Sequence, residues 1–309
     1  FVELFEKKIS NYTKSKNAVA IINGTSAIHI LLKSLGIKFN DEVIVPSLTF
    51  IATANAVKYC GAHPNFVDVT EKNFGICPKK LKIYLNQIAI IKKNYSINRN
   101  SGRKIKALIA VHVFGVPCDI IEIKKVCKKF NIKVIEDAAE GLGSFYGKKH
   151  IGTFGEIGIL SFNGNKILTT GAGGAVITQN KKYFNFIKKV GDVSRAKHKY
   201  ELFYDQVGYN YKMPNMNAAL GYSQFKKLKY FLKYKKILNK VYLNLFKKFD
   251  GKIKLLTNFN KTDSNFWLQA IILENPKFRN LLIKNCIKKN IYLRPIWKPL
   301  HKSKYIVNK

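Results

Sequence analysis

Arginine and acidic residues are scarce in this chain of 309 residues, although its total positive charge is large. Only 18 Asp and Glu stand against 55 Lys and Arg, which gives a formal net charge of +37. Five of these cations are arginines, and the lysines are spread over every segment. Because the planar arginine fork suits phosphate better than lysine does, this distribution favours solvated faces and predicts no nucleic-acid partner. A basic nucleic-acid-binding module stays open as the alternative.

Cysteine pairs, metal-ligand spacings and long apolar runs are missing as well. The five cysteines are scattered and form no C-x-x-C, which is typical of a reducing compartment and predicts a cytoplasmic protein. The six histidines form no H-x-x-x-H and no cluster with cysteine, so we predict no metal site. No apolar run approaches the roughly 18–20 residues that a membrane span requires, so we predict no membrane partner.

Apolar residues are plentiful, and their pattern predicts a folded α/β protein. Hydrophobic residues make up 47% of the chain, and short apolar stretches alternate with stretches of helical periodicity. This order is typical of a mostly parallel sheet that is covered on both faces. After Pro214, one long helix is predicted from Asn215 to about Phe249. A smaller α/β unit follows it, with a last strand at 291–293. We therefore predict a large domain at 1–245 and a small C-terminal domain at 246–309.

The first stretch with chemical content is the turn from Asn23 to Ala27, between a predicted strand and a predicted helix. Gly24 at a helix start exposes backbone N–H groups, and the helix dipole adds partial positive charge, so the turn suits a phosphate. The hydroxyls of Thr25 and Ser26 could donate further hydrogen bonds. A tight turn with an ordinary helix cap is the alternative interpretation.

The second stretch is Glu136-Asp137-Ala138-Ala139-Glu140, which follows an apolar strand. Its acids lie at the carboxyl end of that strand, where ligands bind in open α/β sheets. A carboxylate in this position can hold a proton on a ring nitrogen. A helix-capping acid is the alternative.

Lys166 differs from the many other lysines by its position in the sequence. It follows the strand that ends near Ser161 and lies before a glycine-rich turn at 171–174. A lysine in such a site can have a lowered pKa and bond to a carbonyl carbon. The fourth stretch, 208–213, places Asn210 between two tyrosines just before the long helix, and an ordinary turn is its alternative interpretation.

Together these stretches resemble the DegT/DnrJ/EryC1/StrS sugar aminotransferases, over nearly the whole chain. The resemblance rests on N-G-T-S-A, P-S-L-T-F-I-A-T-A-N-A, E-D-A-A-E, S-F-N-G-N-K, G-A-G-G and G-Y-N-Y-K-M-P-N-M-N-A-A-L-G, in this order. It implies the type I aminotransferase fold, with pyridoxal 5′-phosphate (PLP) bound in the large domain. It also implies a homodimer whose active site lies at the subunit interface.

The resemblance assigns roles residue by residue. Lys166 becomes the catalytic lysine that bonds PLP, and Asp137 the partner of the pyridine nitrogen. Glu140 stands where relatives often carry Gln or His, near the ring oxygen. The remaining cofactor-binding residues are those for the phosphate, the ring face and the neighbouring subunit: Gly24, Thr25, Ser26, Ser161, Phe50 and Asn210.

The resemblance also implies the reaction. Glutamate would donate an amino group to carbon 4 of a nucleotide-linked 4-keto-6-deoxy sugar used in surface polysaccharide. The G-N-K form resembles enzymes that aminate carbon 4 of such sugars. Together, S-F-N-G-N-K, E-D-A-A-E-G-L-G-S, S-G-R-K-I-K-A-L-I and R-P-I-W-K-P-L-H are most similar to the LegC group, which acts on UDP-2-acetamido-4-keto sugars. GDP-perosamine synthases are the alternative, as is a PLP-binding homologue without turnover. Family members usually carry further residues at both ends, so we expect the small domain to be incomplete.

Overall fold

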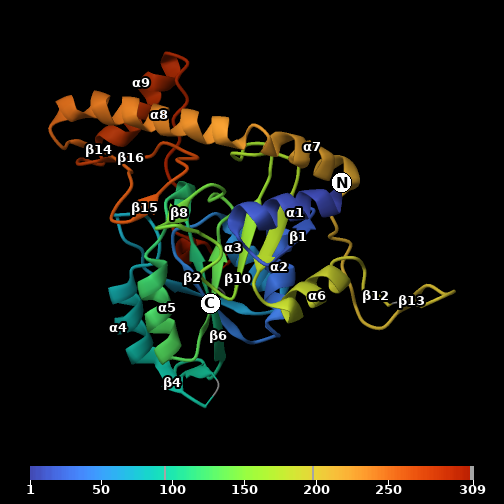
Figure 1. Cartoon of the computed structure of the whole chain (residues 1–309). Helices are drawn as coiled ribbons and strands as arrows, with labels where there is room; N and C mark the ends of the chain where they lie inside the picture. The colour runs from blue at the N-terminus through green and yellow to red at the C-terminus, as the bar shows by residue number, and fades with distance from the viewer. Residues whose placement is uncertain (94, 197, 307–309) are drawn as a thin grey trace.

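The computed structural model describes residues 1–93, 95–196 and 198–306 (Figure 1). Its longer helices are α1 (Val2–Thr13), α2 (Gly24–Ser34), α3 (Ile51–Tyr59), α4 (Pro78–Ile88), α5 (Ile120–Lys129), α6 (Lys181–Val190), α7 (Asn215–Phe225), α8 (Leu228–Phe246) and α9 (Phe278–Lys288). The main sheet contains β1 (Asn17–Ile21), β2 (Glu42–Pro46), β3 (His63–Val67), β4 (Ala89–Ile91), β5 (Ser96–Asn98), β6 (Lys104–Val111), β7 (Lys133–Asp137), β10 (Ile157–Ser161) and β11 (Gly174–Thr178). Smaller sheets are formed by β8 (Phe145–Tyr146), β9 (Lys149–His150), β12 (Arg195–Ala196), β13 (Phe203–Tyr204), β14 (Ile253–Leu255), β15 (Thr262–Asp263) and β16 (Ile271–Leu273).

The main sheet is mixed but mostly parallel, as the sequence predicts. Its strands lie in the order β1-β11-β10-β7-β6-β2-β3, and β4 and β5 extend it beside the start of β6. Along this order only β11 runs antiparallel to its neighbours. The other six strands therefore end at one edge, and the loops that follow them meet there.

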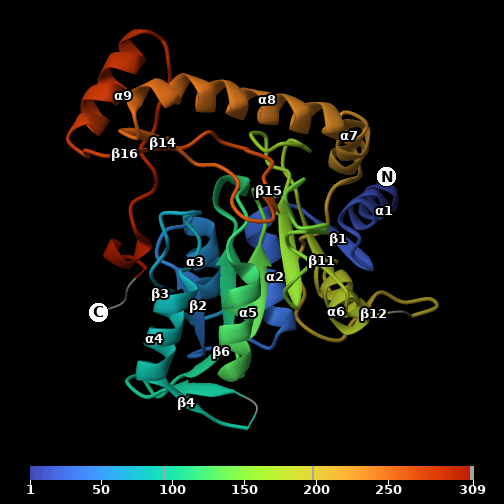
Figure 2. The same cartoon turned by 60° about the vertical axis from the view of Figure 1, so that its left-hand side comes forward.

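Helices cover both faces of this sheet (Figure 2). The strands carry apolar side chains on both sides. Val43 and Ile109 pack into the cluster that contains α1, α2 and α6, while their neighbours Ile44 and Leu108 pack against α4 and α5. Successive side chains of a strand point to opposite faces, so a strand covered on both sides must be apolar at every position. This explains the unbroken apolar runs of the sequence.

The C-terminal part departs from the prediction at two places. The helix expected from 215 to 249 is two helices, because the N–H groups of Lys226 and Lys227 bond three residues back, to Ser223 and Gln224, and tighten the chain between α7 and α8. The strand expected at 291–293 is absent, and that stretch is irregular. In Figure 1, α8 lies across the top of the molecule with α9, β14 and β16 beside it. Within the described residues, no helix is both long and apolar enough to cross a membrane.

Candidate active site

The predicted site residues gather at the edge where the parallel strands end. Asp137 is the last residue of β7, Ser161 the last of β10, and the Asn23 turn follows β1. Lys166 lies five residues beyond β10, in the turn that leads to β11. The parallel topology therefore brings together stretches that are more than a hundred residues apart in the sequence.

Lys166 is a buried amine that faces a buried acid. Its side chain is 13% exposed, and its Nζ lies 3.5 Å from Oε1 of Glu140, which is 8% exposed. Burial lowers the pKa of Lys166 and raises the pKa of Glu140 to about 7. The second carboxylate oxygen of Glu140 accepts a hydrogen bond of 2.7 Å from the backbone N–H of Phe114. Glu140 is thus held in place beside the amine of Lys166.

Asp137 is a second buried acid beside this pair. Thr53, in the first turn of α3, donates its hydroxyl to Oδ2 of Asp137 over 2.8 Å, and the N–H of Ala139 donates to Oδ1. Burial raises the pKa of Asp137, while these donors and Lys166 pull the pKa back down. The Thr53 hydroxyl in turn lies 3.1 Å from that of Thr49. The carboxylate is therefore oriented by hydroxyl and amide groups.

The start of α2 and the end of β10 lie side by side. Asn23 caps the helix by accepting a hydrogen bond from the N–H of Ser26. A Cβ atom at Gly24 would come within 3.3 Å of the Cβ of Ser161, so glycine permits the close approach. The N–H groups in the first turn of a helix have no hydrogen-bond partner within the helix. At the start of α2, the hydroxyl residues Thr25 and Ser26 lie in this turn. The arrangement suits a phosphate group.

The structure places Phe50 directly before α3, the helix that carries Thr53, and places Asn210 in an exposed loop. Phe50 precedes α3, is 54% exposed and lies 6.1 Å from the ring of Trp297. Asn210 is exposed, in a loop that runs beside β1. Within the part of the chain that the structure describes, no hydrogen bond joins Asn210 to Lys166 or Asp137.

Sequence reasoning missed three residues that complete the site. Thr53 lies in the quoted S-L-T-F-I-A-T stretch, in the first turn of α3, and its hydroxyl lies 3.1 Å from that of Thr49. Asn265 and Trp267 come from the C-terminal part, where no motif of the sequence points to them. Their contacts with Lys166 and Glu140 depend on the tertiary fold, and no local pattern reveals them.

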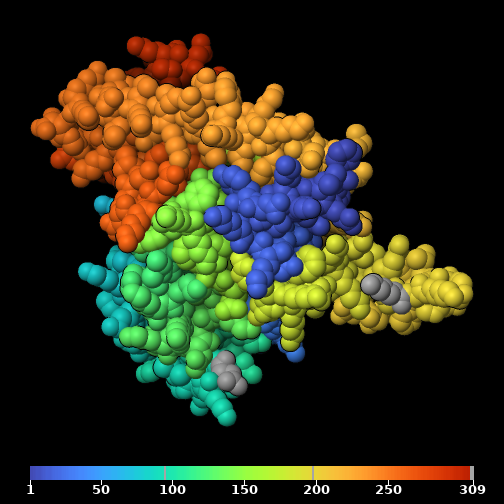
Figure 3. Space-filling model, in the orientation of Figure 1, coloured from blue at the N-terminus to red at the C-terminus, as the bar shows by residue number. Residues whose placement is uncertain are grey.

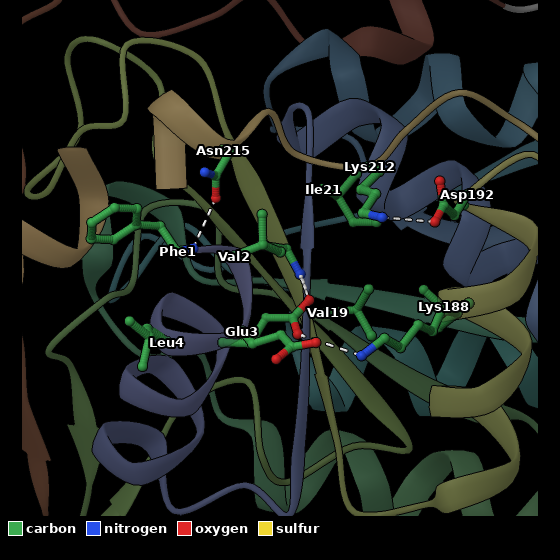
Figure 4. Close-up of a pocket in the computed structure, with 14 residues that line it drawn as sticks. Phe1, Val2, Glu3, Leu4, Val19, Ile21, Lys188, Asp192, Lys212 and Asn215 are labelled. Atoms are coloured by element: carbon green, nitrogen blue, oxygen red, sulfur yellow. Dashed lines mark hydrogen bonds and ion pairs between the residues drawn. The ribbon is translucent and has the colours of Figure 1, made fainter. Parts of the chain in front are cut away.

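A separate hollow of about 370 Å³ lies between α1, β1 and α6 (Figure 4). Its polar groups are already paired, since Glu6 accepts a bond from the N–H of Ala20, and Lys212 lies 2.8 Å from Asp192. None of the predicted site residues is among the residues that line it. The chemistry therefore concentrates at the strand ends around Lys166.

The residues present fit PLP. A largely buried amine with a lowered pKa suits the aldehyde, and the buried carboxylate of Asp137, oriented by Thr53, suits a protonated ring nitrogen. The Gly24–Ser161 approach suits the phosphate. Three polar groups of the cofactor, the aldehyde, the ring nitrogen and the phosphate, thus have a matching group in this site.

The comparisons with known proteins agree with this geometry. The model of the DegT/DnrJ/EryC1/StrS aminotransferase family matches residues 1–309. The chain is 34% identical over 301 residues to the GDP-perosamine synthase of Escherichia coli O157:H7, covering 97% of this chain and 77% of that protein. It is 33% identical over 302 residues to a putative pyridoxal phosphate-dependent aminotransferase, EpsN, of Bacillus subtilis (strain 168), covering 97% and 74%.

A third relative and a solved structure extend the comparison. A UDP-4-amino-4,6-dideoxy-N-acetyl-beta-L-altrosamine transaminase of Campylobacter jejuni is 34% identical over 249 residues, covering 80% of this chain and 62% of that protein. The structure of Helicobacter pylori PseC, an aminotransferase involved in the biosynthesis of pseudoaminic acid, superposes with a TM-score of 0.86 at 25% identity. It covers 99% of this chain and 79% of that one.

The chain belongs to the DegT/DnrJ/EryC1/StrS aminotransferase family. The predicted fold class, the aminotransferase activity and the dependence on PLP are thereby confirmed. The LegC subgroup, the domain boundaries, the roles of the single residues and the incomplete small domain stay predictions.

Proposed function

We propose that this protein transfers an amino group from L-glutamate to carbon 4 of a nucleotide-linked 4-keto-6-deoxy sugar, with PLP held at Lys166. The observation that carries the proposal is the buried Lys166 amine, 3.5 Å from Glu140 and close to Asp137. A lysine with a lowered pKa is neutral more often, and only the neutral amine is a nucleophile.

Bound in this site, PLP supplies an electron sink for the carbon that loses its proton. Asp137 would keep the ring nitrogen protonated, and Thr53 and the N–H of Ala139 hold that carboxylate in its orientation. Lys166 would hold or release a proton at its Nζ, and Glu140 would set the charge around it. Gly24, Thr25, Ser26 and Ser161 would bind the phosphate, and Phe50 would contact the ring.

The two candidate nucleotides of the acceptor, UDP and GDP, each appear in the name of one of the compared relatives. The LegC resemblance and the Campylobacter transaminase support a UDP-linked 2-acetamido-4-keto-2,6-dideoxyhexose as the acceptor. The second candidate is a GDP-linked 4-keto-6-deoxyhexose, supported by the GDP-perosamine synthase that aligns over 97% of this chain. In either case the product is an aminated sugar nucleotide for surface polysaccharide.

A spectral titration tests the function. The PLP-loaded protein should absorb as a cofactor bonded to lysine, lose that band with L-glutamate, and recover it with the correct keto sugar nucleotide. UDP- and GDP-linked keto sugars are added in separate arms, and recovery in one arm identifies the nucleotide. A spectrum that glutamate leaves unchanged would show a PLP-binding protein without this donor reaction.

We propose further that the enzyme is a homodimer, with Asn210 reaching the phosphate site of the neighbouring subunit. The support is an exposed apolar surface near Asn210, on the hairpin of β12 and β13 that projects from the molecule in Figure 3. Its apolar members are Tyr200, Leu202, Phe203, Tyr204 and Val207, each at least 50% exposed. Large exposed apolar groups that lie together mark interaction surfaces.

Two remaining features of the proposal concern the domains and the compartment. The large PLP-binding domain covers 1–245 and the small domain covers 246–309, because β14, β16 and α9 follow the end of α8. All five cysteines are free, which suits the reducing cytoplasm.

A further inference from the structure

A short segment of the C-terminal part is built into the active site. Ser264, Asn265, Phe266 and Trp267 are all buried, with exposed fractions of 0 to 6%. Asn265 donates from its side chain to the carbonyl oxygens of Glu140 and Leu142, over 2.8 Å each. We call residues 264–267 the strap.

The strap packs closely against Gly115, which has no room for a side chain. A Cβ atom at Gly115 would lie 1.9 Å from Oδ1 of Asn265. The carbonyl of Gly115 accepts hydrogen bonds from both Ser144 and Ser264. The Asn265 amide oxygen accepts the backbone N–H of Trp267 over 2.8 Å, so Asn265 also fixes the backbone of Trp267.

Trp267 contacts the lysine and the residue before it. The Nζ of Lys166 lies 3.7 Å from the centre of the Trp267 ring. The indole N–H of Trp267 donates to the backbone carbonyl of Asn165 over 2.7 Å. The face of the Trp267 ring thus contacts the amine of Lys166, and its edge bonds to the loop that carries Lys166.

We propose that Trp267 is a positioning residue for Lys166, which holds the free amine against its ring and stabilises the protonated form there. The strap then fixes both members of the acid–base pair, Glu140 through Asn265 and Lys166 through Trp267. The inference deepens the proposed function and rests on Lys166 being its working amine.

The ring has an effect on Lys166 that is opposite to the effect of burial. A cation over an aromatic face is attracted by the ring quadrupole, and more strongly where water is excluded. Burial lowers the pKa of Lys166, and the facing acids Glu140 and Asp137 raise it. Trp267 adds a further raising influence, so the free amine of Lys166 can hold a proton at its Nζ.

The test measures Lys166 directly in the protein without cofactor. Acetic anhydride labels neutral amines, and peptide mass mapping across a pH series gives the pKa of each lysine. In Trp267→Leu the pKa of Lys166 should fall by about half a unit to one unit, whereas in Trp267→Phe, which keeps a ring, it should stay nearer to the native value. Exposed Lys125 is the internal reference, and Trp297→Leu is the matched control, because Trp297 belongs to the same aromatic group as Trp267.

A second readout separates the N–H of the indole from its face. Both Trp267 variants lose the bond to Asn165, so hydrogen exchange in the peptide that carries residues 162–168 should rise in both and stay native in Trp297→Leu. An equal pKa of Lys166 in the native, Phe and Leu proteins would overturn the proposal. This outcome is independent of the proposed function, because no PLP, glutamate or sugar enters the measurement.

Discussion

At the scale of single residues, the site contains ionisable groups whose pKa values the fold has shifted towards neutral pH. Burial lowers the pKa of Lys166 and raises those of Asp137 and Glu140. Each group is then closer to the pH at which proton transfer is efficient. The cost of burying them is offset by hydrogen bonds from Thr53, Ala139 and Phe114.

Removing the hydroxyl that orients Asp137 should weaken cofactor binding. Thr53→Val keeps the shape of the side chain and deletes the 2.8 Å bond, which leaves Asp137 turned less favourably towards the ring nitrogen. The dissociation constant for PLP should rise about tenfold, as expected for a hydrogen bond to a charged group. Fluorescence titration measures it, and Thr53→Ser should recover most of the affinity. A native affinity in Thr53→Val would contradict the role of this hydroxyl.

Glu140 should make the stability of the cofactor-free protein depend on pH. Its pKa is about 7 in the folded chain against a usual 4.5, so the folded state keeps a proton that the unfolded chain has lost. The stabilisation is present below 4.5 and is lost as the pH rises through 7. From about pH 5 to about pH 8, Tm should therefore fall by a few degrees more in the native protein than in Glu140→Gln. Parallel curves for the two proteins would show that Glu140 titrates normally.

The sequence predicted which residue types carry the chemistry, because they lie in short stretches beside predicted strands. The structure brings Lys166 and Asp137 together with Glu140 and the Gly24 turn, as a parallel sheet requires. Thr53, Asn265 and Trp267 could not be predicted, since their partners are 84 to 125 residues away along the chain. Hydrogen bonds of that kind follow from the tertiary fold alone.

At the scale of elements, the site depends on how closely β11 and β10 approach the start of α2. Gly174 opens β11, and a Cβ atom there would lie 2.7 Å from the carbonyl carbon of Asn23 and 2.8 Å from the N of Gly24. Both atoms belong to the backbone, so they cannot rotate away. The G-A-G-G stretch is therefore needed for packing at the phosphate turn.

Filling that contact should disturb the phosphate turn. Gly174→Ala should push the start of α2 away from Ser161. The N–H groups of the helix would then no longer point at the phosphate, so the dissociation constant for PLP should rise by about tenfold or more. Gly164→Ala is the matched control, since the nearest atom to its Cβ would be 3.8 Å away. It should change the affinity by no more than about twofold. Equal affinities in the two variants would show that the close approach is not needed.

The alternation of strands and helices in the large domain and its mostly parallel sheet were predicted, because the apolar stretches are short and regular. The joint between α7 and α8 was missed, since both helices continue one apolar register and the break lies in two lysines, which are good helix formers. The strand expected at 291–293 was wrong for a different reason. Three apolar residues form a strand only if a neighbouring strand lies within hydrogen-bond reach.

At the scale of the molecule, the charge of +37 comes mostly from lysines that are spread over every segment. Lys166 differs from the exposed lysines because it is largely buried and faces Glu140. The proposed homodimer would use the projecting β12–β13 hairpin and the exposed Asn210 to contact the second copy of the chain.

Mixing two inactive subunits tests that arrangement. In a Lys166→Ala subunit paired with an Asn210→Ala subunit, one site has its own lysine and receives the intact Asn210 from the other chain. Random mixing should therefore restore about a quarter of the native activity, since half of the dimers are mixed and each has one good site. Activity that stays at the sum of the separate variants would show that Asn210 serves its own chain or none.

The account depends most directly on the bond between PLP and Lys166. The loaded protein is treated with borohydride, which reduces the bond irreversibly, and the labelled peptide is mapped by mass spectrometry. We predict a single pyridoxyl group on the side chain of Lys166, and none in Lys166→Ala. A label on another of the many lysines, or no label at all, would contradict the assignment of this site.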